Sequence, residues 1–485
     1  MNLILKVAPF LSCCLVAALG HTQGFEGPWQ GSWNTGMTPF RVAMVFHQEK
    51  GAWHGSFNNI DEGLYGVPLE KIRVKANELQ AELATGEVFD LRLDPSYSRL
   101  EGTCLQVDGH FQRPGEKGSV LLTPGGGYLI PRSSKTYSYH LPQKLSDGWE
   151  VGDLRDLKVD RRPLLKGLQK AADGTFPNIH SVVIAQGGKL VVDEYFYGYG
   201  PGDVHPLQSI TKSVFSILMG IAMGQGKFAL EDRLFDDFPE YRGQRTWSAA
   251  KNGITVRSLL TMTSGLACDD WNDSTSCSWA MVDSPNWLDF SLDQPLAHEP
   301  GLAFAYCGAC LTPLSVLLAR KTGMEVPTFA RKDLLEPLGM GPIVWMRGPH
   351  GVTPASFGLS MRPRDLAKLG LLYLRQGSWE GKPVVPSKWV EGSLCALVPA
   401  SKTHGKGDYG YLWWSKDIEA RGVEFRVHFA WGVGGQYLFL VPELDLVCVV
   451  LAGNENDSRL GAHSWELFKD LVLPAFVRNG PQSPK

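Results

Sequence analysis

The sequence predicts an α+β protein in which an antiparallel sheet is flanked by helices and preceded by a small all-β domain. In the segment PFRVAMVF (39–46), apolar residues alternate with their neighbours, as they do in VFDLRLD (88–94). Such alternation gives a strand one buried and one wet face. Further on, the hairpin HSVVIAQGGKLVVDEYFYGY (180–199) and three late strands enclose a helical middle, which favours a sheet covered by helices.

Length and composition describe a soluble globular chain. The 485 residues are too many for one ordinary core, so two or more domains are expected. Hydrophobic residues make up 44% and charged residues 20% of the chain, the usual mix for a folded protein. The net charge is -3 without a long basic run, so we expect no nucleic-acid partner.

Four segments divide the chain. Residues 1–20 combine Lys6, a short apolar run and the small residues Ala18 and Gly20, which predicts a signal peptide and a secreted or periplasmic protein. A lipoprotein that uses Cys13 or Cys14 fits this segment less well. The apolar run is too short to span a membrane, and no other segment qualifies. Residues 22–125 predict a small antiparallel β barrel or sandwich, residues 126–148 a linker rich in Gly, Pro and Ser, and residues 149–478 the second domain.

The cysteines suggest one disulfide. Seven of the nine cysteines lie after the signal segment, and an odd count leaves at least one thiol unpaired in a monomer. Cys268 and Cys277 flank the polar loop DDWNDSTS, so an exported protein could bridge them. Cys307 and Cys310 have the spacing of a metal or redox pair, but no second ligand pair of matching spacing lies near in sequence. We therefore expect neither a metal nor a cofactor.

Ser209 and Lys212 open an otherwise apolar helical segment, SITKSVFSILMGIAMG. Residues three apart share a helix face, so the hydroxyl and the amine can meet. A lysine held against an apolar interior loses water, which lowers its pKa, and a neutral amine can take the serine proton. The alternative interpretation is a helix cap followed by an exposed lysine.

A second Ser-x-x-Lys tetrad occurs at Ser248 and Lys251, in RTWSAAKNG. It is set in polar sequence without an apolar helix behind it. Because nothing there is expected to bury the lysine, we interpret this copy as a chance match.

Several further motifs follow the first tetrad in a fixed order: GITVRSLLTMTSGL, HEPGLAFAYCGACLTPLSVLLARKTG, LLEPLGM and MRPRDLAKLGLLYL. Together they resemble the serine β-lactamase and penicillin-binding-protein superfamily, and most closely its class C-like branch of family VIII carboxylesterases and 6-aminohexanoate-dimer hydrolases. The resemblance covers roughly residues 160 to 478. It implies a β-lactamase-like antiparallel sheet with an all-helical lobe, and a Ser209 nucleophile with Lys212 as proton acceptor.

The same resemblance assigns roles to two later motifs. Tyr306, in Tyr306-Cys307-Gly308, stands where the family has its acid/base tyrosine, while Gly308 replaces the family's Asn. Ala430-Trp431-Gly432 stands where relatives have Lys-Thr-Gly or His-x-Gly. By analogy, the N-H groups of Ser209 and Val433 would form the oxyanion hole. The expected substrate-contacting residues are Trp431, Gly432, Gly434, Gly435 and Tyr411.

The remaining candidate residues are two tyrosines and the histidines and acids that could form a catalytic triad. Tyr409 and Tyr411 lie in YGYLWW, which fits an aromatic wall of the substrate cleft and core packing equally. A Ser-His-Asp triad is the rival mechanism, but its usual Gly-x-Ser-x-Gly elbow is absent. The residues that could serve such a triad are interpreted as surface or capping residues: His205, Asp232, His298, Glu299 and His428.

The sequence therefore predicts an exported serine hydrolase that cleaves a small-molecule ester or amide through an acyl-enzyme. The lost Lys, Thr and Asn favour an esterase or amidase over a β-lactamase. A penicillin-binding D-alanyl peptidase or β-lactamase is the first alternative, and a non-catalytic binding protein on the same fold is the second. The oligomeric state is left open.

Overall fold

The computed structural model of the protein describes residues 24–35, 39–105, 117–132, 136–271, 276–400 and 407–477. The predicted signal peptide, residues 1–20, lies outside these ranges. Within them, every helix is too short or too polar to cross a bilayer.

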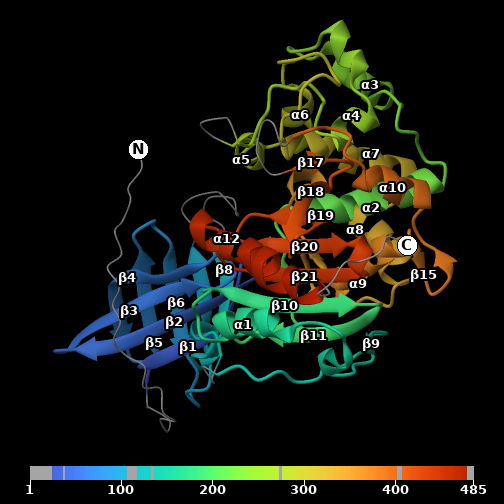
Figure 1. The fold of residues 1–485 in the computed structure, drawn as a ribbon. Coiled ribbons are helices and arrows are strands. Elements are labelled where there is room, and N and C mark those ends of the chain that lie inside the picture. Colours follow the sequence, from blue (N-terminus) through green and yellow to red (C-terminus); the bar gives the residue numbers. More distant parts are fainter. Residues whose placement is uncertain are drawn as a thin grey trace.

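Eight antiparallel strands near the N-terminus close into a barrel, drawn in blue in Figure 1. Each strand pairs with the next, and β8 returns to pair with β1, so the barrel alternative of the prediction is the one observed. The strands are β1 (Gly27–Asn34), β2 (Pro39–Glu49), β3 (Ala52–Asn59), β4 (Leu64–Lys75), β5 (Glu78–Leu83), β6 (Val88–Leu93), β7 (Leu100–Leu105) and β8 (Lys117–Pro124).

The alternating residues of the sequence fill the barrel. Phe40, Val42, Met44 and Phe46 of β2 are all buried, as the period of two predicts. Aromatic rings close the interior, because Trp33 meets the rings of three phenylalanines at about 6 Å between centroids. A closed barrel leaves its strands without a free edge.

The second part of the chain forms an eight-stranded sheet in the order β17-β18-β19-β20-β21-β10-β11-β9. Neighbouring strands are antiparallel except for the short β9, which is parallel to β11. The predicted hairpin supplies β10 and β11, and the three predicted late strands are β19 to β21. The bounds are β9 (Glu150–Val151), β10 (Ile179–Gln186), β11 (Lys189–Tyr195), β17 (Asp408–Tyr409), β18 (Trp414–Ala420), β19 (Val423–Gly432), β20 (Gln436–Val441) and β21 (Leu446–Ala452).

Helices cover both faces of this sheet, and strand β20 shows how. Its alternate residues Leu438 and Leu440 lie against Gly370 of helix α9 (Pro363–Leu374). The residues between them point the other way, and Phe439 stacks on Phe468, 3.8 Å between centroids, beside the C-terminal helix α12 (Ser458–Glu466). A strand buried on both faces reads as a continuous apolar run, which explains QYLFLV.

The remaining helices complete the two layers and a helical lobe. Helix α2 (Ile210–Gly224) lies on the α9 side, where it contacts β19 and β20. Figure 1 shows the short helices of the lobe gathered beyond the β17 end of the sheet. These helices are α3 (Leu234–Asp237), α4 (Val256–Leu260), α5 (Cys277–Val282), α6 (Trp287–Leu292) and α7 (Thr312–Thr322). Of the others, α8 (Val326–Ala330) contacts α7, α10 (Ser387–Leu394) contacts α2, and α1 (Arg161–Ala172) contacts α13 (Leu473–Phe476).

The barrel meets the larger unit through the turn between β3 and β4. A Cβ on Gly63 would lie 1.7 Å from the carbonyl oxygen of Gly453, so only glycine allows this approach. Asn456 donates to the carbonyl of Glu62 at 2.8 Å. The turn is therefore packed tightly against the loop that follows β21.

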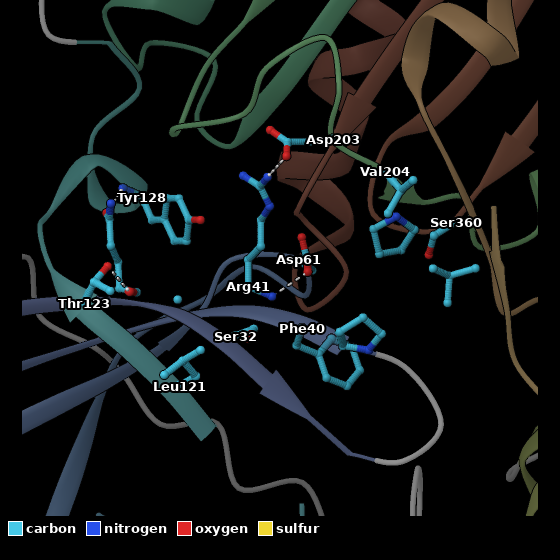
Figure 2. A pocket seen from close by; sticks show the side chains of 15 residues that line it. Ser32, Phe40, Arg41, Asp61, Leu121, Thr123, Tyr128, Asp203, Val204 and Ser360 are labelled. Atoms are coloured by element: carbon cyan, nitrogen blue, oxygen red, sulfur yellow. Dashed lines mark hydrogen bonds and ion pairs between the residues drawn. The ribbon is translucent and has the colours of Figure 1, made fainter. Parts of the chain in front are cut away.

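A cavity of about 370 Å³ lies between the barrel and the larger unit, and Figure 2 shows it from close by. The Arg41 guanidinium pairs with Asp203 at 2.8 Å and stacks over the ring of Tyr199. Asp61 accepts from the backbone N-H of Arg41 at 2.7 Å and from the Tyr199 hydroxyl. The charged groups of this cavity thus already have partners inside the protein.

The Glu62 carboxyl at this junction makes stability depend on pH. Burial, and then the nearby Asp61, raises its pKa to about 7. Between pH 4.5 and 7 the folded state therefore keeps a proton on Glu62 that the unfolded state has released. The contribution of Glu62 to the free energy of unfolding is highest below pH 4.5, where both states are protonated, and falls as pH rises to 7. Glutamine does not titrate, so we expect the free energy of unfolding of Glu62→Gln, relative to that of the wild type, to increase by up to about 3 kcal/mol between pH 4.5 and pH 7.

Urea unfolding at pH 4.5 and pH 8 measures this difference. The exposed Glu70→Gln variant is the control and should leave the pH dependence unchanged. A Glu62→Gln variant whose stability relative to the wild type is the same at both pH values would contradict the prediction.

Candidate active site

Ser209 stands at the N-cap of α2, a deeply buried helix of the larger unit. Every residue from Ile210 to Ala222 is buried, because the helix is apolar nearly all round. Its polar side chains have partners, and the hydroxyls of Ser213 and Ser216 donate to the carbonyls of Leu412 and Tyr411, each at 2.7 Å. The serine side chain therefore lies at the N-terminus of a helix whose position is fixed by buried contacts.

The turn that presents Ser209 is conformationally unusual. Gln208, the preceding residue, has a φ of 48°, in the left-handed region that non-glycine residues seldom adopt. Its side chain amide bonds the carboxylate of Glu455. Residues in sparsely populated conformations persist where the surroundings fix them, often at functional sites.

The amine of Lys212 lies 2.8 Å from the Ser209 hydroxyl oxygen, within hydrogen-bond distance. It also donates to the carbonyl of Ser356 at 3.1 Å and lies 4.7 Å from the centroid of the Tyr306 ring. Lys212 is only 4% exposed. The structure therefore brings together Ser209, Lys212 and Tyr306, three residues spread over almost a hundred positions of sequence.

Aromatic rings surround Tyr306. Trp271 stacks on it with 4.4 Å between centroids and 15° between planes. Trp414 stacks at 5.9 Å, and Tyr409 meets the ring edge-on at 6.4 Å. Because Tyr306 is buried among these rings, its position depends on aromatic packing as well as on the backbone.

The glycines at the end of β19 allow the strand to approach the serine. A Cβ on Gly432 would lie 2.6 Å from the carbonyl oxygen of Leu207, two residues before Ser209. Gly434 and Gly435 follow with φ values of 85° and 94°, which favour glycine. Val433, which lies between Gly432 and Gly434, is 48% exposed. The arrangement leaves the segment carrying Ser209 and the 432–435 turn in direct contact.

A cavity of about 300 Å³ adjoins this turn. Four of its eleven lining residues are aromatic, so it offers ring surfaces to an apolar group. Trp431, at its edge, is half-buried and lies 5.9 Å from Trp271 between ring centroids. The lining residues are Lys416, Phe429, Trp431, Val433, Gly434, Gly435, Tyr437, Ser458, Gly461, Ala462 and Trp465.

Tyr411 lies elsewhere. Its ring packs on Trp389 at 5.2 Å between centroids, and its hydroxyl bonds Arg257. Its carbonyl contacts α2 two turns beyond Ser209. Tyr409, rather than Tyr411, is the tyrosine of YGYLWW that meets Tyr306; Tyr409 ends β17, whereas Tyr411 lies outside that strand.

The expectation that nothing would bury Lys251 is wrong. Lys251 is 1% exposed, and its amine donates to Thr246 and to the carbonyl of Leu292, each at 2.9 Å. Burial lowers its pKa. Its amine is therefore committed to partners other than Ser248, whose side chain is exposed.

The interpretation of His205 as a surface residue is also wrong. His205 is fully buried, and its Nε2 lies 2.8 Å from Nδ1 of His180. Burial lowers the pKa of His205 to about 4. Asp232 is partly buried and accepts from the N-H of Ala229 at 2.8 Å within a turn, whereas the N-cap of α3 is Arg233. His298 and Glu299 are exposed and His428 is partly buried.

Two disulfides lie beside Tyr306. Cys268 is bonded to Cys277, and Cys307 to Cys310, the pair whose spacing resembles a metal or redox motif. The sulfurs of Cys268, Cys307 and Cys310 lie within 4.8 Å of one another. Because each is part of a disulfide, none is available as a thiolate ligand.

Several residues of this site carry no signal in the sequence. Gln208, Asp270, Trp271, Ser356 and Glu455 all contact the Ser209, Lys212, Tyr306 or glycine-turn segments. Their spacing from those segments follows no period, because loops bring them there. Only the nearness of Trp271 to the predicted Cys268–Cys277 bridge could have drawn attention to that loop.

Comparisons with known proteins agree with the motifs. The family described as Beta-lactamase matches residues 173–467. The chain is 26% identical over 289 residues to the 6-aminohexanoate-dimer hydrolase of Paenarthrobacter ureafaciens, which covers 56% of this chain and 71% of that protein.

Solved structures share the fold at low identity. A protein of Bacillus anthracis assigned as a 6-aminohexanoate-dimer hydrolase matches with a TM-score of 0.53 and 17% identity, over 72% of this chain and 89% of that one. EstCE1, described as a hydrolase with promiscuous acyltransferase activity, matches with a TM-score of 0.50 and 16% identity, over 63% and 98%.

The disulfides can be tested by alkylation of the denatured, unreduced protein. We expect iodoacetamide to modify the described cysteines that lie outside the bridges, namely Cys104, Cys395 and Cys448. Cys268, Cys277, Cys307 and Cys310 should react only after dithiothreitol treatment, as peptide mass spectrometry would show. Modification of any of these four without reductant would contradict the pairing.

Proposed function

The chain belongs to the beta-lactamase family, whose relatives here are hydrolase-type enzymes, and from this we propose that it is an exported serine hydrolase that cleaves an ester or amide through a Ser209 acyl-enzyme. The observation that carries the proposal is the 2.8 Å approach of the Lys212 amine to the Ser209 hydroxyl at the mouth of a buried helix. Export stays a prediction from residues 1–20.

The proposed reaction begins at Ser209. As its Oγ forms a bond to the substrate carbonyl carbon, its proton passes to the amine of Lys212. The N-H groups of Ser209 and Val433 hold the resulting oxyanion, aided by the N-terminus of α2. The approach of Gly432 to Leu207 supports this pairing, because it brings the two segments together.

Tyr306 completes the proposed cycle. The Lys212 amine lies 4.7 Å from the centroid of its ring, so the two side chains are neighbours, and the proposed cycle includes a proton transfer from this amine to the Tyr306 hydroxyl. When the tetrahedral intermediate collapses, the bond to the leaving group breaks and Tyr306 supplies that group with its proton. A water molecule then cleaves the acyl-enzyme and restores the Ser209 hydroxyl.

The aromatic cavity beside Val433 supports an apolar substrate group. Phe429, Trp431, Tyr437 and Trp465 supply broad ring surfaces, and apolar burial drives binding into such a pocket. The Lys-Thr pair that binds the carboxylate of a β-lactam in the family is replaced here by Ala430 and Trp431. We therefore propose an ester or amide with an apolar chain or ring in preference to a β-lactam.

Replacement of the nucleophile tests the proposal. We expect Ser209→Ala to lower kcat/KM for p-nitrophenyl acetate and butyrate by roughly 10³-fold or more, as in enzymes that lose their nucleophile. The chain supplies its own control in the second tetrad, where Ser248→Ala should hydrolyse both esters at the wild-type rate. Equal rates for Ser209→Ala and the wild type would leave the binding-protein alternative standing.

A fluorescent penicillin separates the proposed esterase or amidase from the penicillin-binding alternative. We expect little labelling of the wild type at penicillin concentrations that saturate a penicillin-binding protein. Stoichiometric labelling that disappears in Ser209→Ala would support the D-alanyl peptidase alternative instead.

A further inference from the structure

Asp270 stands at the centre of a hydrogen-bond cluster behind Tyr306. One carboxylate oxygen accepts from the Ser276 hydroxyl and from the Ser278 N-H, each at 2.8 Å. The other accepts from the Ser278 hydroxyl at 2.7 Å and from the Gly308 N-H at 2.8 Å. A carboxylate offers about four acceptor sites, and four donors occupy them here.

The backbone of Asp270 adds a fifth hydrogen bond, which is the second one to the Tyr306–Gly308 segment. Its N-H donates to the carbonyl of Tyr306 at 2.8 Å. Asp270 therefore binds the Tyr306–Gly308 segment at both ends, through its own N-H at residue 306 and through its side chain at residue 308. The next residue, Trp271, stacks on the Tyr306 ring.

The absence of a side chain at Gly308 allows the Asp270 carboxylate to approach this backbone. A Cβ at this position would lie 2.5 Å from the Ser278 hydroxyl, 3.1 Å from the Ser356 hydroxyl and 3.2 Å from the Asp270 carboxylate. The space beside residue 308 is thus filled by oxygen atoms from helix α5 and from the loops that carry Asp270 and Ser356. One of these loops also meets Lys212, since the Ser356 carbonyl accepts from its amine.

We propose that Asp270 is a positioning residue that fixes Tyr306 against Lys212 and Ser209 by clamping the Tyr306–Gly308 backbone. This inference rests on the proposed serine-hydrolase function. Asp270 acts through the backbone and not on the substrate, because its acceptor sites are already filled. Hydrogen bonds to an ionised carboxylate are stronger than neutral ones, so a charged acceptor suits this task.

The variant Asp270→Asn tests the proposal on the full chain. An amide has one acceptor oxygen, and its NH₂ would face a backbone N–H that can only donate, either that of Gly308 or that of Ser278, so at least one of the four bonds is lost. We expect kcat for p-nitrophenyl acetate to fall roughly 10- to 100-fold, since small misplacements of a reacting group cost that much. We expect KM to change less than threefold, and the pH at half-maximal kcat to move as the proton-transfer geometry changes.

The neighbouring carboxylate provides the matched control. Asp269 accepts from the N-H of Trp271 at 2.9 Å, a bond that an amide oxygen can also make. We expect Asp269→Asn to keep kcat within about twofold and the pH profile of the wild type. A second pair, Gly308→Ala and Gly308→Ala/Ser278→Ala, tests the packing: the single variant should lose activity, and removal of the Ser278 hydroxyl should restore part of it.

The outcomes separate this inference from the proposed function. A wild-type kcat and pH profile in Asp270→Asn would overturn the positioning role while Ser209→Ala remained inactive. So would a loss of activity that only follows the loss of folded protein, with unchanged kcat per folded molecule by near-ultraviolet circular dichroism. If Ser209→Ala were as active as the wild type, the proposed function would fail and this inference with it.

Discussion

The contact between the Ser209 hydroxyl and the Lys212 amine is the constraint around which the larger unit is built. A lysine side chain 4% exposed needs partners, because a buried amine without them is costly. The structure supplies a hydroxyl, a carbonyl and an aromatic face. Each partner comes from a different part of the chain, so the fold must bring the three parts to the mouth of α2.

Two features make this possible. Helix α2 is apolar on all sides and is held between the sheet and the α7 and α10 regions, which fixes the Ser209–Lys212 face. The glycine turn after β19 approaches the backbone before Ser209 more closely than a side chain would allow. A rigid helix end and a closely packed strand end together define the place where a substrate carbonyl can sit.

The barrel is connected to the segment before Ser209 through the loop that follows β21. Its Glu62 turn packs against the loop after β21, and Glu455 of that loop bonds Gln208, the residue before Ser209. Both Glu62 and Glu455 have raised pKa values, chiefly through burial. The junction between the two parts of the chain is thus close to the candidate nucleophile, even though the barrel has no catalytic motif of its own.

Sequence reasoning succeeded where the information is local or periodic. Alternation along β2, the apolar run of α2 and the three late strands all follow from residue periods, and the ordered motifs predict the family. It failed where burial depends on distant segments: Lys251 is covered by the C-terminal end of α6 at Leu292, and His205 by His180 and Tyr199. Asp270 could not be found because its partners lie up to 38 positions away in loops without a repeating pattern.

The most direct test of the account is to identify the residue that reacts with a fluorophosphonate probe. Peptide mass spectrometry should find the phosphonyl adduct on Ser209 in the wild type, and the Lys212→Met variant should form it far more slowly. An adduct on a different residue, or an equal rate of labelling without the lysine, would contradict the claim that Lys212 activates Ser209.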